Sequence, residues 1–238
     1  MLQSLLIGVV ALFTLAVVLV VARGPLFGTR IYRPMLWNLA LSLAPLFVLF
    51  VAMVLWAVAT ALGAYVVAGT VVAVGAVAWL LMLPNAAYLV TELNLNHRRP
   101  GEKVPEWYDV LSVLVLAMSG VLTTVLNVFV VQVEYMVVRF GDTAAPLVST
   151  EMRVMGGVVL VLVSFGVWMG RNIRVNSWDV LRPWRFAARV LAHLRTQGTA
   201  LNALGFTVVA TLFFATMYLV IVGPVIEGLV LIEALRGG

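Results

Sequence analysis

The sequence of 238 residues contains no cysteine, one lysine (Lys103) and two histidines, and only 11% of its residues are charged. Without cysteine, the chain cannot form a disulfide, a thiolate metal site or a cysteine nucleophile. About a quarter of the residues in a soluble domain are charged, so the composition excludes an ordinary soluble domain. The hydrophobic fraction of 63% also excludes a disordered chain.

In place of charge, the sequence has long apolar blocks. Six of them are long enough to cross a hydrocarbon layer of ~30 Å as helices, and they cover residues 2–22, 35–58, 61–83, 110–133, 154–169 and 201–222. Runs that are apolar on every side, such as 71–78, are typical of helices in lipid, whereas barrel strands alternate. The sequence therefore predicts an all-α polytopic integral membrane bundle of six transmembrane helices, forming a single domain over residues 1–238.

Three shorter segments add detail to this bundle. Only Ala59 and Thr60 separate the second and third blocks, which predicts a tight helical hairpin. Residues 184–195 alternate arginines with apolar residues at helical spacing, which predicts an amphipathic helix on an anionic membrane surface. Residues 225–235 are too few to span a bilayer. We expect an interfacial helix there, and the alternative is a short seventh segment.

The basic residues are distributed unevenly between the loops. Twelve follow the first, third and fifth blocks: Arg23, Arg30, Arg33, Arg98, Arg99, Lys103, Arg171, Arg174, Arg182, Arg185, Arg189 and Arg195. Only Arg139, Arg153 and Arg236 lie on the other side. Because basic loops stay in the cytoplasm, we expect a bacterial inner-membrane protein with both termini outside. Topology alone explains these arginines, so no nucleic-acid partner is expected.

The start of the chain carries no basic residue before its first apolar block. No small-residue cleavage site follows that block either. A cleaved signal peptide needs both features, so we expect the first block to be a retained transmembrane helix.

Polar residues gather in three clusters, and the predicted topology places all three on the cytoplasmic side. In the first, residues 84–97, a helix resuming after Pro84 would align Asn85, Tyr88 and Glu92 on one stripe. Thr91 is the neighbouring hydroxyl. The alternative is a helix end kinked by proline, with Asn85 capping freed backbone groups and Tyr88 at the membrane interface.

The second cluster, residues 105–109, opens the fourth apolar block. Pro105 and Glu106 suit the first turn of a helix. Asp109, however, lies so close to the apolar run that it needs a polar partner. An arginine from a neighbouring loop is the expected one.

The third cluster, residues 170–179, contains Arg171, Arg174, Asn176, Ser177 and Asp179. One interpretation is a basic flank followed by a capped turn. The other is a binding site, because arginine and asparagine donors suit phosphate or carboxylate groups.

These clusters suggest a candidate site, which we divide by chemistry. The carboxylates Glu92, Asp109 and Asp179 could act as catalytic bases. The ligand-binding candidates are Asn85, Tyr88, Thr91, Arg171, Arg174, Asn176 and Ser177. If the site is real, five residues converge: Asn85, Glu92, Asp109, Arg174 and Asp179. At least one arginine–carboxylate contact should then join clusters from different loops, with Arg171 and Arg174 as the nearest arginines. No metal site is predicted, and the cofactor is left unassigned.

The same clusters carry a resemblance to a known family. The stretch 84–93, Trp107-Tyr108-Asp109 and the segment 170–179 with its Asn-Ser-Trp-Asp motif resemble, in order and spacing, a bacterial multi-pass membrane family. It is number 1361 among the domains of unknown function, and the resemblance covers most of residues 60–185. The family pattern has Asp at the position of Glu92 and His at that of Leu95, whereas this chain has His97. The resemblance implies the architecture and supplies no reaction.

Three functions are compatible with this sequence. The first is a polar site at the cytoplasmic face that binds or transforms a lipid headgroup or small anion, with the bilayer and its anionic lipids as partners. The second is a transporter or channel; because no predicted span carries a charge at its centre, ion-coupled transport is disfavoured, whereas a passive path is not. The third is a non-catalytic subunit that packs against a membrane-protein partner through Gly63, Gly69 and Gly75.

Overall fold

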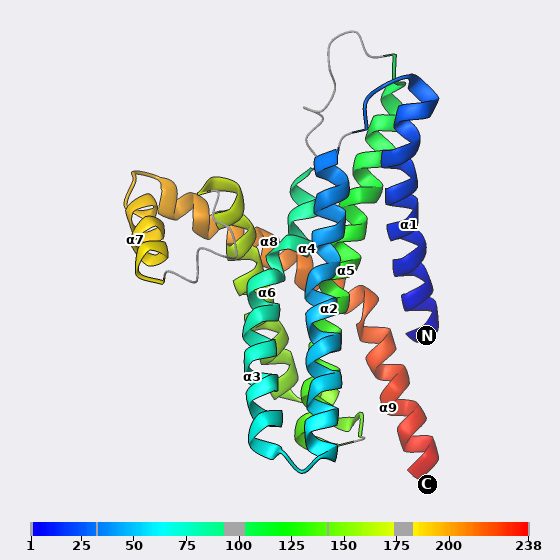
Figure 1. The fold of residues 1–238 in the computed structure, drawn as a ribbon, viewed down its shortest axis with the longest axis vertical. Coiled ribbons are helices and arrows are strands. Elements are labelled where there is room, and N and C mark those ends of the chain that lie inside the picture. The colour runs from blue at the N-terminus through cyan, green and yellow to red at the C-terminus, as the bar shows by residue number, and fades with distance from the viewer. Residues whose placement is uncertain (1, 32, 93–102, 142, 174–182, 238) are drawn as a thin grey trace.

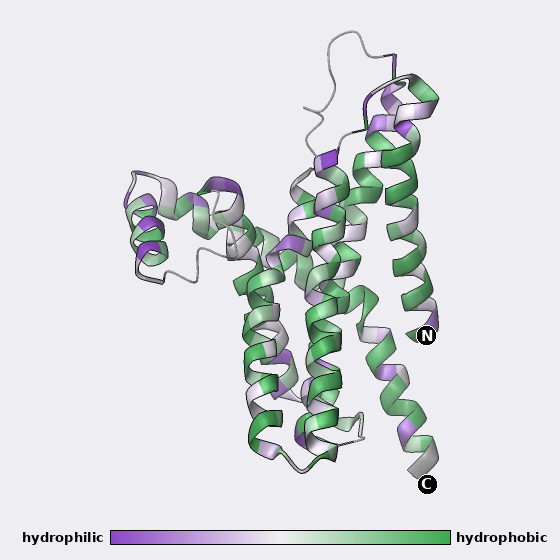
Figure 2. Ribbon diagram, in the orientation of Figure 1, coloured by the Kyte–Doolittle hydropathy of each residue, from purple (hydrophilic) through white to green (hydrophobic). Residues whose placement is uncertain are grey.

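The computed structural model describes residues 2–31, 33–92, 103–141, 143–173 and 183–237. These residues form helices, and no strand occurs among them. Six segments are long and apolar enough to cross a membrane, which confirms the predicted all-α multi-pass membrane protein. Figure 2 shows that the upright helices are largely hydrophobic and that hydrophilic residues concentrate toward the upper end and on the side arm.

The main helices of the bundle are α1 (Leu2–Phe27), α2 (Arg33–Ala61), α3 (Tyr65–Met82), α5 (Glu106–Phe140), α6 (Thr150–Asn172) and α8 (Thr199–Ile221). Shorter elements complete it: α4 (Pro84–Tyr88), the 3-10 turns η1 (Leu89–Glu92) and η2 (Ala145–Val148), α7 (Pro183–Leu194) and α9 (Gly223–Gly237). The α2–α3 hairpin turns at Gly63, whose φ of 72° favours glycine. This confirms the predicted hairpin.

Helix α5 is the centre of the bundle. Its apolar window is 72% buried, against 17% for α1 and 22% for α2. Lipid offers no hydrogen bonds, and two buried amide side chains of α5 are bonded within the protein. Asn127 accepts from Trp79 Nε1 at 3.0 Å and donates to the Thr123 carbonyl at 2.8 Å. Gln132 donates to the Met152 carbonyl at 2.7 Å.

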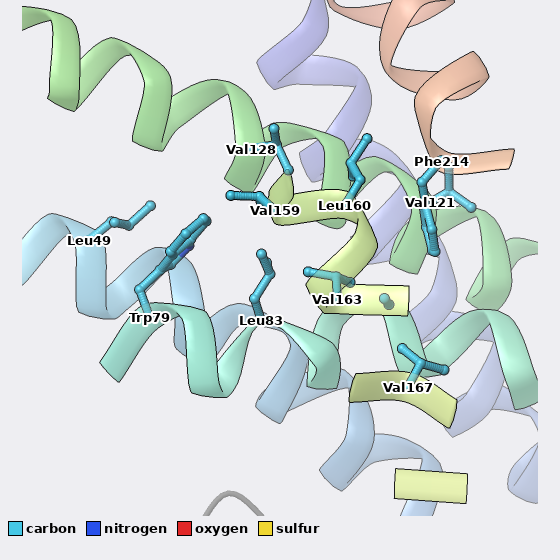
Figure 3. Close-up of a cluster of buried hydrophobic side chains, with 11 residues drawn as sticks. Leu49, Trp79, Leu83, Val121, Val128, Val159, Leu160, Val163, Val167 and Phe214 are labelled. Atoms are coloured by element: carbon cyan, nitrogen blue, oxygen red, sulfur yellow. The ribbon is translucent and has the colours of Figure 1, made fainter. Parts of the chain in front are cut away.

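The largest apolar cluster joins α3, α5, α6 and α8. Figure 3 shows the Trp79 ring near Leu49 and Leu83, with Val128 and Val159 on the other side of the cluster. Phe214 contributes from α8. The cluster also includes Ala87 and Val167, so it reaches from the middle of the bundle to the first polar segment.

Two helices depart from the expected ends. Helix α3 ends just before Pro84, as predicted. Helix α4 begins at Pro84, so the first polar cluster starts in helical conformation. Helix α5 extends to Phe140, beyond the expected end at Val133. Glu134 did not end this helix, and it therefore lies within a candidate membrane span.

The C-terminal segment forms a helix of its own. In Figure 1, α8 crosses the bundle obliquely and α9 turns to run along its long axis. Val225 is buried beside Leu126 and Phe129, and Leu229 packs near Met136. The expected interfacial helix and its alternative, a short seventh segment, both stay predictions.

The segment predicted as an amphipathic helix over residues 184–195 forms helix α7, Pro183–Leu194, and its place on an anionic membrane surface stays a prediction. It lies at the side of the bundle, beyond the ends of α6 and α8 (Figure 1). Its contact with the bundle includes the His193 ring, whose centroid is 6.0 Å from that of Trp168. The Trp184 side chain of α7 is 87% exposed, so this apolar side chain is largely free of contact with the rest of the protein.

Candidate functional site

Two glycines let α4 pack tightly into the bundle. A Cβ atom at Gly120 of α5 would lie 2.6 Å from Leu89 Cβ and 2.9 Å from the Ala86 carbonyl oxygen. A Cβ atom at Gly166 of α6 would lie 2.5 Å from Pro84 Cγ. Small residues allow such close approach between membrane helices. The first polar cluster is therefore held between α5 and α6, which fixes the position of η1.

A groove of about 920 Å³ opens where η1, the C-terminal part of α6 and α8 meet. Arg171 and Thr91 line it, and Arg171 Nη1 donates to the Thr91 carbonyl oxygen at 3.3 Å. This contact joins the first and third predicted clusters. The guanidinium group has five donors, and the exposed Arg171 side chain presents them at the edge of an otherwise mostly apolar groove.

The far wall of the groove comes from α8, which the sequence did not indicate. Its apolar residues include Phe206, Val209 and Phe213, and its first turn supplies Asn202. Asn202 Oδ1 accepts from Trp168 Nε1 at 3.0 Å, which ties α8 to α6. The one available signal was an asparagine at the start of an apolar block; without knowing that α8 packs on α6, it could not be linked to Arg171.

Asp109 finds an arginine, but not one of the two expected. Its Oδ1 accepts from Arg23 Nε at 2.9 Å, and the two side chains are only 10% and 15% exposed. The preceding residue, Tyr108, donates its hydroxyl to the Leu19 carbonyl at 2.8 Å. The last turns of α1 thus lie beside the first turn of α5, which brings Arg23 to Asp109, while Arg171 is engaged at Thr91.

The second cluster therefore stands apart from the groove. Leu89 packs on Gly120, and Asp109 is eleven residues earlier on α5, about 16 Å along the helix axis at 1.5 Å per residue. Thr91 and Arg171 meet, although neither is among the five residues predicted to converge. Of those five, Asp109 lies away from the groove, in an ion pair that ties α1 to α5.

The remaining candidates divide into two groups. Asn85 and Tyr88 are half-buried on α4, and the groove is lined instead by Ala87, Val90 and Thr91 of this segment. The other predicted features lie outside the described residues: the side chain of Glu92, and Arg174, Asn176, Ser177 and Asp179.

The described residues offer no metal site, and most of the predicted glycine stripe is used within the chain. Among the described residues, no three acidic or histidine side chains group so that they could hold a metal ion. Of the three glycines proposed to meet a partner helix, Gly75 packs on Ala52 of the same chain. Gly63 forms the α2–α3 turn, and a Cβ atom at either Gly63 or Gly69 would meet nothing within 4 Å.

Comparison with known proteins gives one match. The family model described as a protein of unknown function, DUF1361, matches residues 37–219. These residues include α4, the Arg171 end of α6 and almost all of α8, so the groove lies within the matched region. No curated protein and no solved structure matches the chain.

Proposed function

Because the chain belongs to the DUF1361 family, whose description names no activity, we propose a function from the groove itself: binding of an anionic amphiphile, a molecule with a phosphate headgroup and an apolar tail. The observation that carries the proposal is the position of Arg171 at the edge of a groove with apolar walls. We place this groove at the cytoplasmic face of the bacterial inner membrane, because it opens at the end of the bundle that carries the basic loops.

The charge of the groove favours an anion. Arg171 and the Asn202 amide are its polar side chains together with the Thr91 hydroxyl, which donates to the Tyr88 carbonyl. No carboxylate is found among the described residues that line it. Charge-assisted bonds from arginine to phosphate are stronger than bonds between neutral groups. An anionic headgroup at this edge would therefore be bound without a competing acid.

The walls favour an apolar tail. Val209 is 68% exposed on α8, and Phe206 and Phe213 flank it on the groove side. In a membrane helix, such a surface faces hydrocarbon. The volume of about 920 Å³ lies within the range of ligand pockets, enough for a headgroup and the first part of a chain.

Helix α7 supports the same kind of ligand. Arg185 and Arg189 are exposed on it, and its contact with Trp168 through His193 places it next to the groove wall. Basic amphipathic helices concentrate anionic lipids at the membrane surface. We infer that α7 lies on the bilayer and raises the local concentration of the groove's ligand.

The described lining supports binding over catalysis. A reaction on the headgroup needs a general base within hydrogen-bond reach. In the described lining there is none, and the Asp109 carboxylate is paired with Arg23. We therefore propose binding rather than transformation.

Isothermal titration of the full chain in detergent tests the proposal. The probes are dihexanoyl-phosphatidylglycerol, the zwitterionic dihexanoyl-phosphatidylcholine and inorganic phosphate. We expect the anionic lipid to bind about tenfold more tightly than the zwitterionic one, with the preference lost in Arg171→Gln. Arg153→Gln is the matched control, because Arg153 is exposed at the opposite end of the same helix.

Each outcome of this titration is informative. Binding of the lipid but not of phosphate would show that the tail is needed. Equally tight binding of phosphate alone would make the ligand a small anion. Equal affinity for the two lipids, or an unchanged preference in Arg171→Gln, would contradict the proposal.

A further inference from the structure

A second cavity lies at the other end of the bundle. It has a volume of about 310 Å³ and is formed by α2, α3, α5 and α6, toward the α2–α3 turn and the α5–α6 connection at the lower end of Figure 1. No residue lines both this cavity and the Arg171 groove. Its walls are apolar and aromatic, and its one ionisable acid is Glu134.

Glu134 is a carboxylate in apolar surroundings. It lies six residues before the end of α5, half-buried between Val131 and Val138, which also line the cavity. In the part of the chain that the structure describes, no hydrogen bond or ion pair of Glu134 is found. The nearby Arg139 lies over the Phe140 ring, at 6.0 Å from its centroid. A carboxylate in a membrane span without a partner marks a functional site by default.

Three aromatic residues complete the lining. Trp79 is buried and held by its bond to Asn127, while Trp56 is half-buried on α2. Tyr135 donates its hydroxyl to Glu151 Oε1 at 2.5 Å, which ties its ring to the start of α6. Aromatic rings attract cations through their π-systems, most strongly for tryptophan. The carboxylate and the rings thus favour the same kind of ligand.

The position of the cavity along α5 favours an amphiphilic ligand. Glu134 and Asp109 are 25 residues apart on α5, about 37 Å at 1.5 Å per residue. This exceeds the ~30 Å hydrocarbon layer, so the two acids cannot both lie deep within it. A ligand at Glu134 can place its charge toward the end of α5 and its apolar body among the aromatic walls.

We propose that this cavity binds a small lipophilic cation, an ammonium group carried on an apolar body, with Glu134 as its counter-ion. Trp56, Trp79 and Tyr135 form the walls for the ammonium group and the apolar body. The volume is at the lower end of ligand pockets, which limits the ligand to a compact molecule.

The test compares a cation with its neutral isostere. Benzyltrimethylammonium and neopentylbenzene have the same shape, and only the first is charged. Both are titrated into the full chain in nanodiscs of phosphatidylcholine, which carry no net charge. We expect the cation to bind about tenfold more tightly than the isostere, as a carboxylate and aromatic walls together predict.

Glu134→Gln isolates the charge, because the amide keeps the shape of the side chain. The variant should lose about tenfold in affinity for the cation and keep its affinity for neopentylbenzene, which also reports that the cavity is intact. Glu227→Gln, an exposed acid on α9, should change neither affinity. Equal binding of the two probes by the natural protein, or an unchanged cation affinity in Glu134→Gln, would overturn the proposal.

Discussion

Two acidic side chains of α5 lie in apolar surroundings, and they differ in whether a basic partner is present. Asp109, in the first turn, is paired with Arg23 of α1 at 2.9 Å. Glu134, near the other end, lines a cavity and is without a partner in the described structure. A paired carboxylate holds helices together, whereas an unpaired one is available to a ligand. The role of an acid on a membrane helix therefore depends on the residues that it contacts and not on its position in the sequence.

The largest effect should come from breaking the Asp109 pair. Asp109→Asn leaves Arg23 poorly compensated in a site that is 85–90% buried, and we expect a loss of about 3 kcal/mol in the free energy of unfolding. Thermal or denaturant unfolding in detergent measures it. The double variant Arg23→Gln/Asp109→Asn should lose less than the two single variants together. Additive losses would show that the two side chains act independently.

The packing of α4 should matter nearly as much. Gly120→Ala brings a Cβ atom to 2.6 Å from Leu89 Cβ, and overpacking of this kind costs about 2 kcal/mol. Gly69→Ala is the control, because open space surrounds Gly69. The free energy of unfolding of Gly120→Ala should be clearly lower than that of Gly69→Ala. The Glu134 cavity, which is not lined by α4, should still bind neopentylbenzene; equal stability of the two variants would refute the tight packing.

The effect of Glu134→Gln on stability should be small and should not destabilise. Since the unpaired carboxylate loses its charge and no partner is left behind, we expect a change within about 1 kcal/mol, zero or stabilising. The same unfolding measurement applies. A loss as large as that of Asp109→Asn would mean that Glu134 has a structural partner, and the contrast between the two acids would fail.

Cysteine labelling leaves stability unchanged and assigns the two ends to the two sides of the membrane. The chain has no cysteine, so single introduced thiols report cleanly. Ala145→Cys, exposed at the Glu134 end, should react with an impermeant maleimide from outside intact cells. Gln197→Cys, exposed between α7 and α8, should react only after lysis. The reverse pattern would invert the predicted orientation.

Much of this architecture could be predicted from the sequence, because lipid leaves the backbone few choices. Apolar runs gave the six spans, and the alternation in residues 184–195 gave α7. The ends were less accurate: α5 was expected to stop before Glu134, yet a charged residue that faces a cavity does not end a helix.

The site was harder to predict, because it depends on which helices are neighbours. The need of Asp109 for an arginine followed from its depth, but its partner Arg23 was counted only as a topology signal. Arg171 was chosen from a dense polar cluster and lies in the groove with Thr91. Asn202 and the α8 wall were missed, since spacing along the chain does not reveal the contact between α6 and α8.

Native mass spectrometry of the lipid retained by the protein tests the proposed function most directly. The natural chain, Arg171→Gln and Arg153→Gln are released from nanodiscs with equal amounts of phosphatidylglycerol and phosphatidylcholine. We expect phosphatidylglycerol to stay bound to the natural chain and to Arg153→Gln, and no such preference in Arg171→Gln. Retention of both lipids in equal amounts by the natural chain, or the same preference in all three proteins, would contradict the account.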